Sequence, residues 1–173
     1  MNEKKQNVVL TGFMGTGKTT VGRFLAAELG YALVDTDKLI AQRAGKPIHL
    51  IFKEDGEAVF RDWEAQLAAE LTRQKQLVIA TGGGMLVSER NAEIMQEAAD
   101  IFCLTASPRE ILSRVQLSGN RPLLDTPKPL ERIKELLAER EAAYGRFTQI
   151  KTSLKKPQRI AKEIVKALQK SEK

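Results

Sequence analysis

The chain has 173 residues, 42% of them hydrophobic and 29% charged, which fits one ordinary domain with a buried core and excludes a disordered chain. Its one cysteine, Cys103, excludes an intrachain disulfide and a cysteine metal cage, and its one histidine, His49, excludes a two-histidine metal site. The sequence has no apolar run of membrane-spanning length and no secretory signal at its polar start. We therefore expect a cytoplasmic protein with no membrane partner.

The net charge of +6 comes entirely from the C-terminal segment. Residues 1–150 hold 20 basic and 20 acidic residues, whereas residues 151–173 hold eight basic and two acidic ones. In that segment apolar residues recur at helical spacing with lysines between them, and no aromatic residue is present to stack on bases. We interpret the segment as a helix with a solvated basic face and expect no nucleic-acid partner; a nucleic-acid-binding tail is the alternative.

Apolar runs bounded by glycine or polar clusters alternate with amphipathic segments along the chain. The predicted strands are 7–11, 31–34, 77–81, 101–105 and 149–152. The predicted helices are 19–29, 37–44, 57–74, 88–99, 108–117, 130–147 and 157–170, with a further helical turn at 48–52. This alternation predicts an α/β fold with a parallel sheet between helical layers. Because no linker or repeat divides the chain, we expect residues 1–173 to form one domain.

A phosphate-binding loop follows the first predicted strand. Gly12–Thr19 (GFMGTGKT) matches G-x-x-x-x-G-K-[ST], and a helix is predicted directly after it. Backbone N–H groups and the positive end of that helix can hold phosphates, Lys18 can reach the β- and γ-phosphates, and the Thr19 hydroxyl can bind Mg²⁺. The alternative is a plain strand–turn–helix connection. The nucleotide-binding residues predicted here are Met14, Gly15, Thr16, Gly17, Lys18, Thr19 and Thr20.

Two acidic residues close the second predicted strand, at Asp35 and Asp37. The strand at 77–81 runs into glycines and offers no acid, so the carboxylate for Mg²⁺ must come from elsewhere. Residues i and i+2 of extended backbone point the same way, so we expect both carboxylates to face one pocket. One would hold Mg²⁺ directly or through water, and the other would accept a substrate hydroxyl hydrogen bond and its proton. A turn and N-cap pair is the alternative.

The predicted helix 57–74 carries Arg61, a bidentate donor suited to a carboxylate or phosphate. Glu64 lies on the same helix face and could hold this arginine, although a surface ion pair is the alternative. Gly82–Gly84 could let a substrate approach the backbone and its N–H donors, or could form only a tight turn.

The polar stretch 118–129 contains Arg121 and could close over a nucleotide, bringing this arginine to the transferring phosphoryl group. An ordinary loop arginine is the alternative. Arg140 and Tyr144 form an i, i+4 pair whose default interpretation is packing and solvent contact.

Together these motifs resemble the shikimate kinase family over nearly the whole chain. The shared pieces, in the same order, are GxxGxGKT at Gly12–Thr19, DTD at Asp35–Asp37, IF…DGE…FR..E at Ile51–Glu64, GGG at Gly82–Gly84, RPLL at Arg121–Leu124 and R…Y at Arg140–Tyr144. Only the phosphate loop and the glycine-rich pieces are generic. The combination is specific.

The resemblance implies a nucleoside-monophosphate-kinase-like, three-layer P-loop fold with a five-stranded parallel sheet, a substrate-binding segment at about 35–64 and a short lid at about 117–128. It implies transfer of the γ-phosphoryl group of ATP to the 3-hydroxyl of shikimate, giving shikimate 3-phosphate and ADP in aromatic amino acid biosynthesis. It also implies Mg²⁺ as cofactor and a monomer.

The resemblance further implies residue roles. Lys18, Asp37 and Arg121 would be catalytic, with Asp37 as the favoured base, and Thr19 and Asp35 would hold Mg²⁺ and its waters. Adenine would lie between Arg114 and Pro157, with Lys155 beside it. The residues implied to bind shikimate are Asp37, Phe52, Phe60, Arg61, Gly82, Gly83, Gly84 and Arg140.

Two other functions were weighed against this one. The first is a kinase of the same fold with another small acceptor, such as gluconate or a nucleoside monophosphate. The second is a P-loop nucleic-acid-binding module that uses the basic tail, which predicts tight binding with a steep salt dependence.

Overall fold

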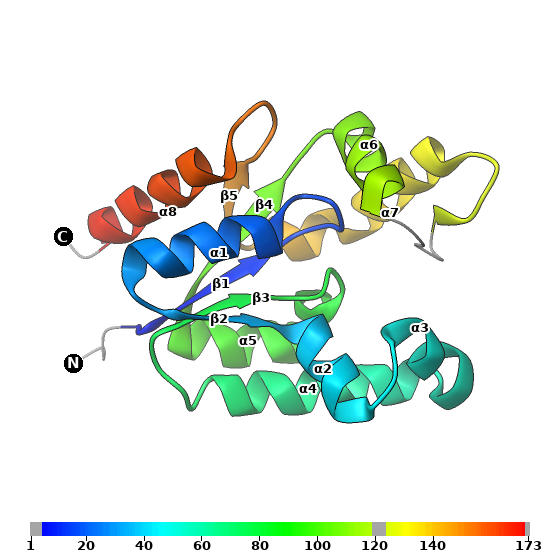
Figure 1. Ribbon diagram of the computed structural model, residues 1–173, viewed down its shortest axis with the longest axis horizontal. Coiled ribbons are helices and arrows are strands. Elements are labelled where there is room, and N and C mark those ends of the chain that lie inside the picture. The colour runs from blue at the N-terminus through cyan, green and yellow to red at the C-terminus, as the bar shows by residue number, and fades with distance from the viewer. Residues whose placement is uncertain (1–4, 119–123, 172–173) are drawn as a thin grey trace.

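A computed structural model describes residues 5–118 and 124–171. Five parallel strands form one sheet in the order β2-β3-β1-β4-β5 (Figure 1). The strands are β1 (Asn7–Thr11), β2 (Ala32–Asp35), β3 (Leu77–Ala80), β4 (Ala99–Thr105) and β5 (Thr148–Lys151). The predicted parallel sheet is therefore confirmed, with strand ends shifted by one or two residues.

The phosphate-loop strand β1 lies in the middle of the sheet, between β3 and β4. Every residue of β1 and β3 is buried, because helices cover both faces of a parallel sheet. This burial explains why both strands read as continuous apolar runs rather than as alternating patterns. The carboxyl ends of β1, β2 and β3 consequently meet at one edge, where such sheets bind ligands.

Helices cover the two faces of the sheet as separate layers (Figure 1). One layer consists of α1 (Lys18–Leu29) and α8 (Pro157–Ser171), which pack against each other. The other contains α4 (Glu57–Leu71), α5 (Glu89–Ala98) and α7 (Pro129–Tyr144), with α6 (Pro108–Ser118) packed on α7. Each layer has its own core, so the two faces of the sheet are stabilised separately.

The core beneath α1 and α8 is purely apolar. Its buried members are Val8, Leu10, Val21, Leu25, Ala26, Val78, Phe102, Leu104, Ile160, Ala161 and Ile164. The larger core on the opposite face includes Phe13 of the phosphate loop and Phe60 of α4. The larger core therefore reaches the phosphate loop itself, and the core beneath α1 and α8 reaches the strand and the helix on either side of that loop.

Short helical elements project from the edge next to β2. They are α2 (Thr36–Ala44), α3 (Ile48–Leu50) and a π-helical turn at Ile51–Asp55, and a 3-10 turn at Met85–Val87 follows the triple glycine. Helix α2 begins one residue earlier than predicted, at Thr36, because the Asp35 carboxylate accepts the Lys38 backbone N–H and caps the helix.

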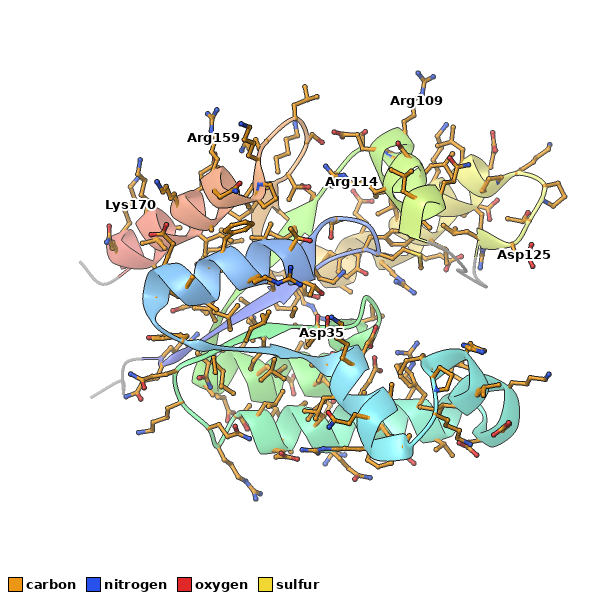
Figure 2. All side chains as sticks on the ribbon, viewed as in Figure 1. Asp35, Arg109, Arg114, Asp125, Arg159 and Lys170 are labelled. Carbon is orange, nitrogen blue, oxygen red and sulfur yellow. The ribbon has the colours of Figure 1, made fainter. Side chains whose placement is uncertain are left out.

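The basic face of α8 points away from the body of the protein, as Arg159 and Lys170 illustrate in Figure 2. Ile160, Ala161 and Ile164 on the opposite side are buried. The predicted amphipathic terminal helix is thus confirmed. Within the described ranges, no helix combines the length and the apolar content needed to cross a membrane.

Candidate active site

The phosphate loop adopts a conformation that requires its glycines. Gly12, Gly15 and Gly17 have φ values of 129°, 74° and 97°, in the region that favours glycine. A Cβ on Gly12 would collide with the Leu104 carbonyl, and one on Gly15 would lie 2.9 Å from Cγ2 of Val115. The loop is therefore seated directly on β4 and α6, and its shape is fixed by close backbone approach.

Lys18 begins α1 and reaches back over this loop. Its ammonium donates hydrogen bonds to the carbonyls of Gly12 at 2.6 Å and Phe13 at 2.9 Å. The buried Thr16 hydroxyl donates to the same Phe13 carbonyl at 2.7 Å. A positive group thus lies at the carboxyl end of β1, beside the N-terminus of α1, and both favour a bound anion.

Thr19 and Asp35 form a pair of oxygen ligands beside the loop. The Thr19 hydroxyl donates to Oδ2 of Asp35 at 2.6 Å, and Oδ1 of Asp35 caps α2. Mg²⁺ is usually bound by one or two protein oxygens, with waters and phosphate oxygens completing its octahedron. In the part of the chain that the structure describes, no group of three or more acidic, histidine or cysteine side chains that could hold a metal ion is present. The hydroxyl of Thr19 and the carboxylate of Asp35 are the kind of oxygen pair that Mg²⁺ shared with a nucleotide would use.

The two acidic residues do not lie on one extended segment as predicted. Asp35 ends β2, whereas Asp37 lies in the first turn of α2. Asp35 contacts Thr19, while the Asp37 carboxylate lies so close to Gly82 that a Cβ there would collide with it. The N-cap alternative is therefore correct for Asp35, and the helix start separates the directions of the two carboxylates.

Arg61 is held by an ion pair with a buried carboxylate. Its Nη1 lies 2.6 Å from Oε2 of Glu64, whose side chain is only 1% exposed, and Glu57 contacts Arg61 from one turn earlier. Burial raises the pKa of Glu64 and the Asp37 charge adds to that rise, against the opposing effect of Arg61. The alternative of a surface ion pair is wrong, because Glu64 lies inside the protein.

Arg140 and Tyr144 of α7 join the triple glycine. The Tyr144 hydroxyl donates to the Gly83 carbonyl at 2.6 Å, and Nη1 of Arg140 lies 3.3 Å from that hydroxyl. Tyr144 is 6% exposed. This pair therefore connects α7 to the sheet edge rather than only packing on the surface, which corrects the default interpretation.

Each glycine of the triplet faces a different functional side chain. A Cβ would meet Asp37 at Gly82, Arg140 at Gly83 and Arg61 at Gly84. The Gly82 N–H also donates to the Thr36 hydroxyl at 2.9 Å. One carboxylate and two guanidinium groups, from three separate helices, thus converge on one short backbone segment.

Aromatic rings line the same region. The Phe52 and Phe60 rings lie 4.7 Å apart, with Phe60 buried and Phe52 partly exposed. Arg61 lies 5.5 Å from the Phe60 ring centre, and Arg140 lies 5.5 Å from that of Phe13. These rings give the two guanidinium groups an apolar surround, which strengthens their attraction for an anion.

The expected nucleotide residues lie on the α6 and α8 side of the loop. Arg114 of α6 donates to the Gly15 carbonyl and to the Thr152 hydroxyl, both at 3.2 Å, and lies beside the loop in Figure 2. Pro157 begins α8, and Lys155 is paired with Glu163 at 2.8 Å. Arg121, in the centre of the expected lid, lies outside the described residues.

Two residues that organise the site lie inside the motifs but had no role assigned to them from the sequence. The Thr36 hydroxyl and the Tyr144 hydroxyl both bond to the triple glycine, over sequence separations of 46 and 61 residues. Thr36 sits inside the acidic motif and Tyr144 is four residues from Arg140, so both stood next to recognised residues. Their hydrogen-bond partners in the triple glycine come close only when the sheet edge is assembled, so no local sequence pattern indicates these bonds.

The chain is similar to known kinases in sequence and in fold. The family model described as Shikimate kinase matches residues 14–169. The shikimate kinase of Thermodesulfovibrio yellowstonii is 43% identical over 93% of this chain and 94% of its own. That of Geobacter sulfurreducens is 46% identical over 81% of this chain and 77% of its own.

Among solved structures, the shikimate kinase of Acinetobacter baumannii in complex with shikimate has a TM-score of 0.91 and 34% identity, covering 98% of this chain and 96% of that one. A gluconokinase from Sinorhizobium meliloti, with a TM-score of 0.62 and 16% identity, shares the fold alone. The family match and these relatives agree with the motifs and with the geometry at the sheet edge. The chain belongs to the shikimate kinase family.

Proposed function

We propose that this protein is a shikimate kinase, which transfers the γ-phosphoryl group of ATP to the 3-hydroxyl of shikimate to give shikimate 3-phosphate and ADP. The observation that carries this proposal is the convergence of Arg61, Arg140 and Asp37 on Gly82–Gly84, beside the phosphate loop. Two guanidinium groups and one carboxylate match a small acceptor that has one carboxylate and several hydroxyls.

On the acceptor side, Arg61 and Arg140 bind the shikimate carboxylate. Glu64 fixes the direction of Arg61, and Tyr144 lies against Arg140, so neither arginine must be ordered by the substrate. Asp37 accepts a hydrogen bond from the acceptor hydroxyl and receives its proton as that oxygen attacks phosphorus. Phe52 and Phe60 form the apolar wall, and the backbone of Gly82–Gly84 lines the opposite side.

On the nucleotide side, residues 14–20 bind the phosphates, and Lys18 neutralises charge on the β- and γ-phosphates. The adenine lies between Arg114 and Pro157, with Lys155 beside it, and Arg121 reaches the transferring group from the lid. Thr19 and Asp35 hold Mg²⁺ and its waters. When bound, Mg²⁺ withdraws charge from the phosphate oxygens and so makes phosphorus easier to attack.

We further propose that the enzyme acts as a cytoplasmic monomer without a nucleic-acid partner. The basic residues of α8 lie on a solvated helix face, where Glu163 pairs with Lys155 and lies near Arg159. Sedimentation velocity tests the monomer, and an RNA titration at increasing salt tests the absence of binding. A steep fall of RNA affinity with salt would contradict this part of the proposal.

The test of the activity is ADP release from MgATP with shikimate, compared with gluconate, CMP and AMP as acceptors. We expect turnover with shikimate and none above background with the other three. A folded protein that binds ATP and releases ADP only with another acceptor would overturn the proposed substrate.

Two variants test the acceptor roles. Asp37→Asn is expected to lower kcat sharply while MgADP binding survives, because the residue acts on the acceptor hydroxyl. Arg61→Ala is expected to raise the KM for shikimate more than that for ATP. A near-normal kcat for the first variant, or a change confined to the ATP KM in the second, would remove the assigned role.

A further inference from the structure

A carboxylate on α6 ties this helix to the connection between β5 and α8. Oε2 of Glu110 accepts the Ser153 hydroxyl hydrogen at 2.5 Å, although the two residues are 43 positions apart. The Glu110 side chain is 27% exposed, so the contact lies partly inside the protein. The same Oε2 accepts the Ser107 hydroxyl at 2.8 Å and the Ser107 N–H at 3.3 Å.

Glu110 therefore has two separable functions. With Ser107 it forms a capping box, because the Glu110 N–H also donates back to the Ser107 hydroxyl at 3.3 Å. This cap stabilises the start of α6 and needs no other element. The contact with Ser153 adds nothing to the cap, since it joins the helix to a different segment. These hydrogen bonds, that from Ser153 foremost, hold the pKa of Glu110 at about 2, so the carboxylate stays ionised near neutrality.

The segment tied in this way borders the phosphate loop. One residue before Ser153, Thr152 is fixed on β4, with its N–H and its hydroxyl donating to the Thr105 carbonyl at 2.8 and 3.0 Å. The Thr152 hydroxyl also accepts from Arg114, whose guanidinium donates to the Gly15 carbonyl. Glu110 and Arg114 are neighbours on one face of α6, so the same helix holds the segment at both Thr152 and Ser153.

Beyond the tie, the segment exposes an apolar side chain. Leu154 is 100% exposed, and its φ of 58° lies in the left-handed region that costs a leucine conformational energy. Its neighbour Lys155 is fixed by Glu163 and by a backbone bond to Thr152 at 3.3 Å. The connection between β5 and α8 is thus held at Ser153 and at Lys155, on both sides of Leu154, which contributes nothing to the core.

We propose that Glu110 and Ser153 are positioning residues for the nucleotide: their hydrogen bond fixes the β5–α8 connection against Arg114, so that the base of ATP meets a preformed surface. This inference rests on the proposed function for the nucleotide itself, but it adds two residues that touch neither the phosphates nor the acceptor. Without the bond the connection must be ordered at the moment of binding, and nucleotide affinity falls.

The test compares Ser153→Ala with Ser107→Ala as a matched control. Ser153→Ala removes the tie and leaves the capping box, whereas Ser107→Ala removes the hydroxyl of the capping box and leaves the tie. The measurement is the Kd for MgADP by isothermal titration calorimetry, with thermal melting in parallel. We expect Ser153→Ala to raise this Kd about three- to tenfold, which corresponds to the usual net contribution of one hydrogen bond. Ser107→Ala should lower the Tm and leave the Kd unchanged.

Two further measurements separate positioning from general stability. Ser153→Thr keeps a hydroxyl and is expected to restore the MgADP Kd, and the KM for shikimate is expected to stay constant in all three variants. An unchanged Kd in Ser153→Ala would overturn the inference, and so would an equal rise in Ser107→Ala. Because MgADP binding needs no acceptor, the result remains decisive even if shikimate turnover fails, and only that turnover failure would count against the proposed function.

Discussion

Replacing Gly84 by alanine tests the acceptor site with a single methyl group. Gly84 has φ −93° and ψ −11°, a backbone conformation that alanine adopts without strain. The new Cβ would lie 2.6 Å from Nη1 and 2.9 Å from Nη2 of Arg61. Only the end of a flexible side chain must move, so the fold tolerates the change, but that end is the group proposed to bind the shikimate carboxylate.

The size of the effect follows from the displacement. Ordinary contact requires at least 3.4 Å, so the guanidinium must retreat by about 0.8 Å from its place beside Glu64. A misplacement of about 1 Å in a positioning group typically costs up to about a hundredfold in rate. We therefore expect kcat/KM for shikimate to fall about ten- to hundredfold, or about 1.4 to 2.7 kcal/mol of transition-state stabilisation, mainly through KM.

The assay is steady-state ADP release with shikimate and ATP varied in turn, and Gly83→Ala is the matched control. There the nearest atom to the new Cβ is Nη1 of Arg140, at an ordinary 3.4 Å, and neither glycine has left-handed backbone. Because Gly83 also lines the proposed acceptor site, the control should lose some activity but clearly less than Gly84→Ala, and the ATP KM should change in neither variant. Equal kinetics for the two variants would refute the reasoning, because the contact distances would then not determine the loss.

Three other predictions concern charge. Asp35→Asn keeps a good N-cap for α2 but removes the charge beside Thr19. We therefore expect an unchanged Tm and an increase of about tenfold in the free Mg²⁺ concentration needed for half-maximal rate. An unchanged Mg²⁺ dependence would contradict the metal role. Burial raises the pKa of Glu64, so as pH rises above the ordinary value of 4.5 the unfolded chain loses this proton before the folded chain does, and the free energy of unfolding falls through that range. Glu64→Gln should therefore gain Tm relative to the unmodified protein as pH rises above about 4.5, with a higher shikimate KM. A relative loss of Tm as pH rises would show the opposite sign. Burial raises the pKa of the Cys103 thiol to about 11. A thiol reagent at about pH 8 should therefore modify Cys103 only after the protein unfolds. Rapid modification of the native protein would disprove the burial of Cys103.

The sheet and its helices could be predicted because the relevant signals are local. The strand at 7–11, the glycine-rich loop and the following helix lie within 25 residues, and Gly30 ends α1 in left-handed backbone. The prediction that Asp35 and Asp37 lie on one extended segment was wrong because two local preferences compete at Asp35. Alternation along a strand and the N-cap preference of aspartate both apply to Asp35, and the cap prevails because it satisfies the Lys38 N–H at the start of α2.

Several residues named from the sequence come together at the triple glycine, but their arrangement was not predicted. Spacing on one helix placed Glu64 next to Arg61, and the ion pair is present. Its burial could not be read from the sequence, because a glutamate on an amphipathic helix gives the same pattern whether it faces solvent or a covered pocket. The assignment of one glycine of the triplet to each of Asp37, Arg140 and Arg61 depends on β3 lying between β2 and β1, a matter of strand order.

The packing of α8 against α1 has a consequence for how the protein forms during synthesis. The phosphate-loop helix α1 buries its apolar face under Ile160 and Ile164, which leave the ribosome more than 130 residues after it. Until those residues emerge, the apolar side chains of α1 that pack on α8 have no cover. The helical layer that contains α1 is therefore completed only late in translation, although the phosphate-loop motif is among the first segments made, and the nascent chain exposes part of this apolar face in the interval.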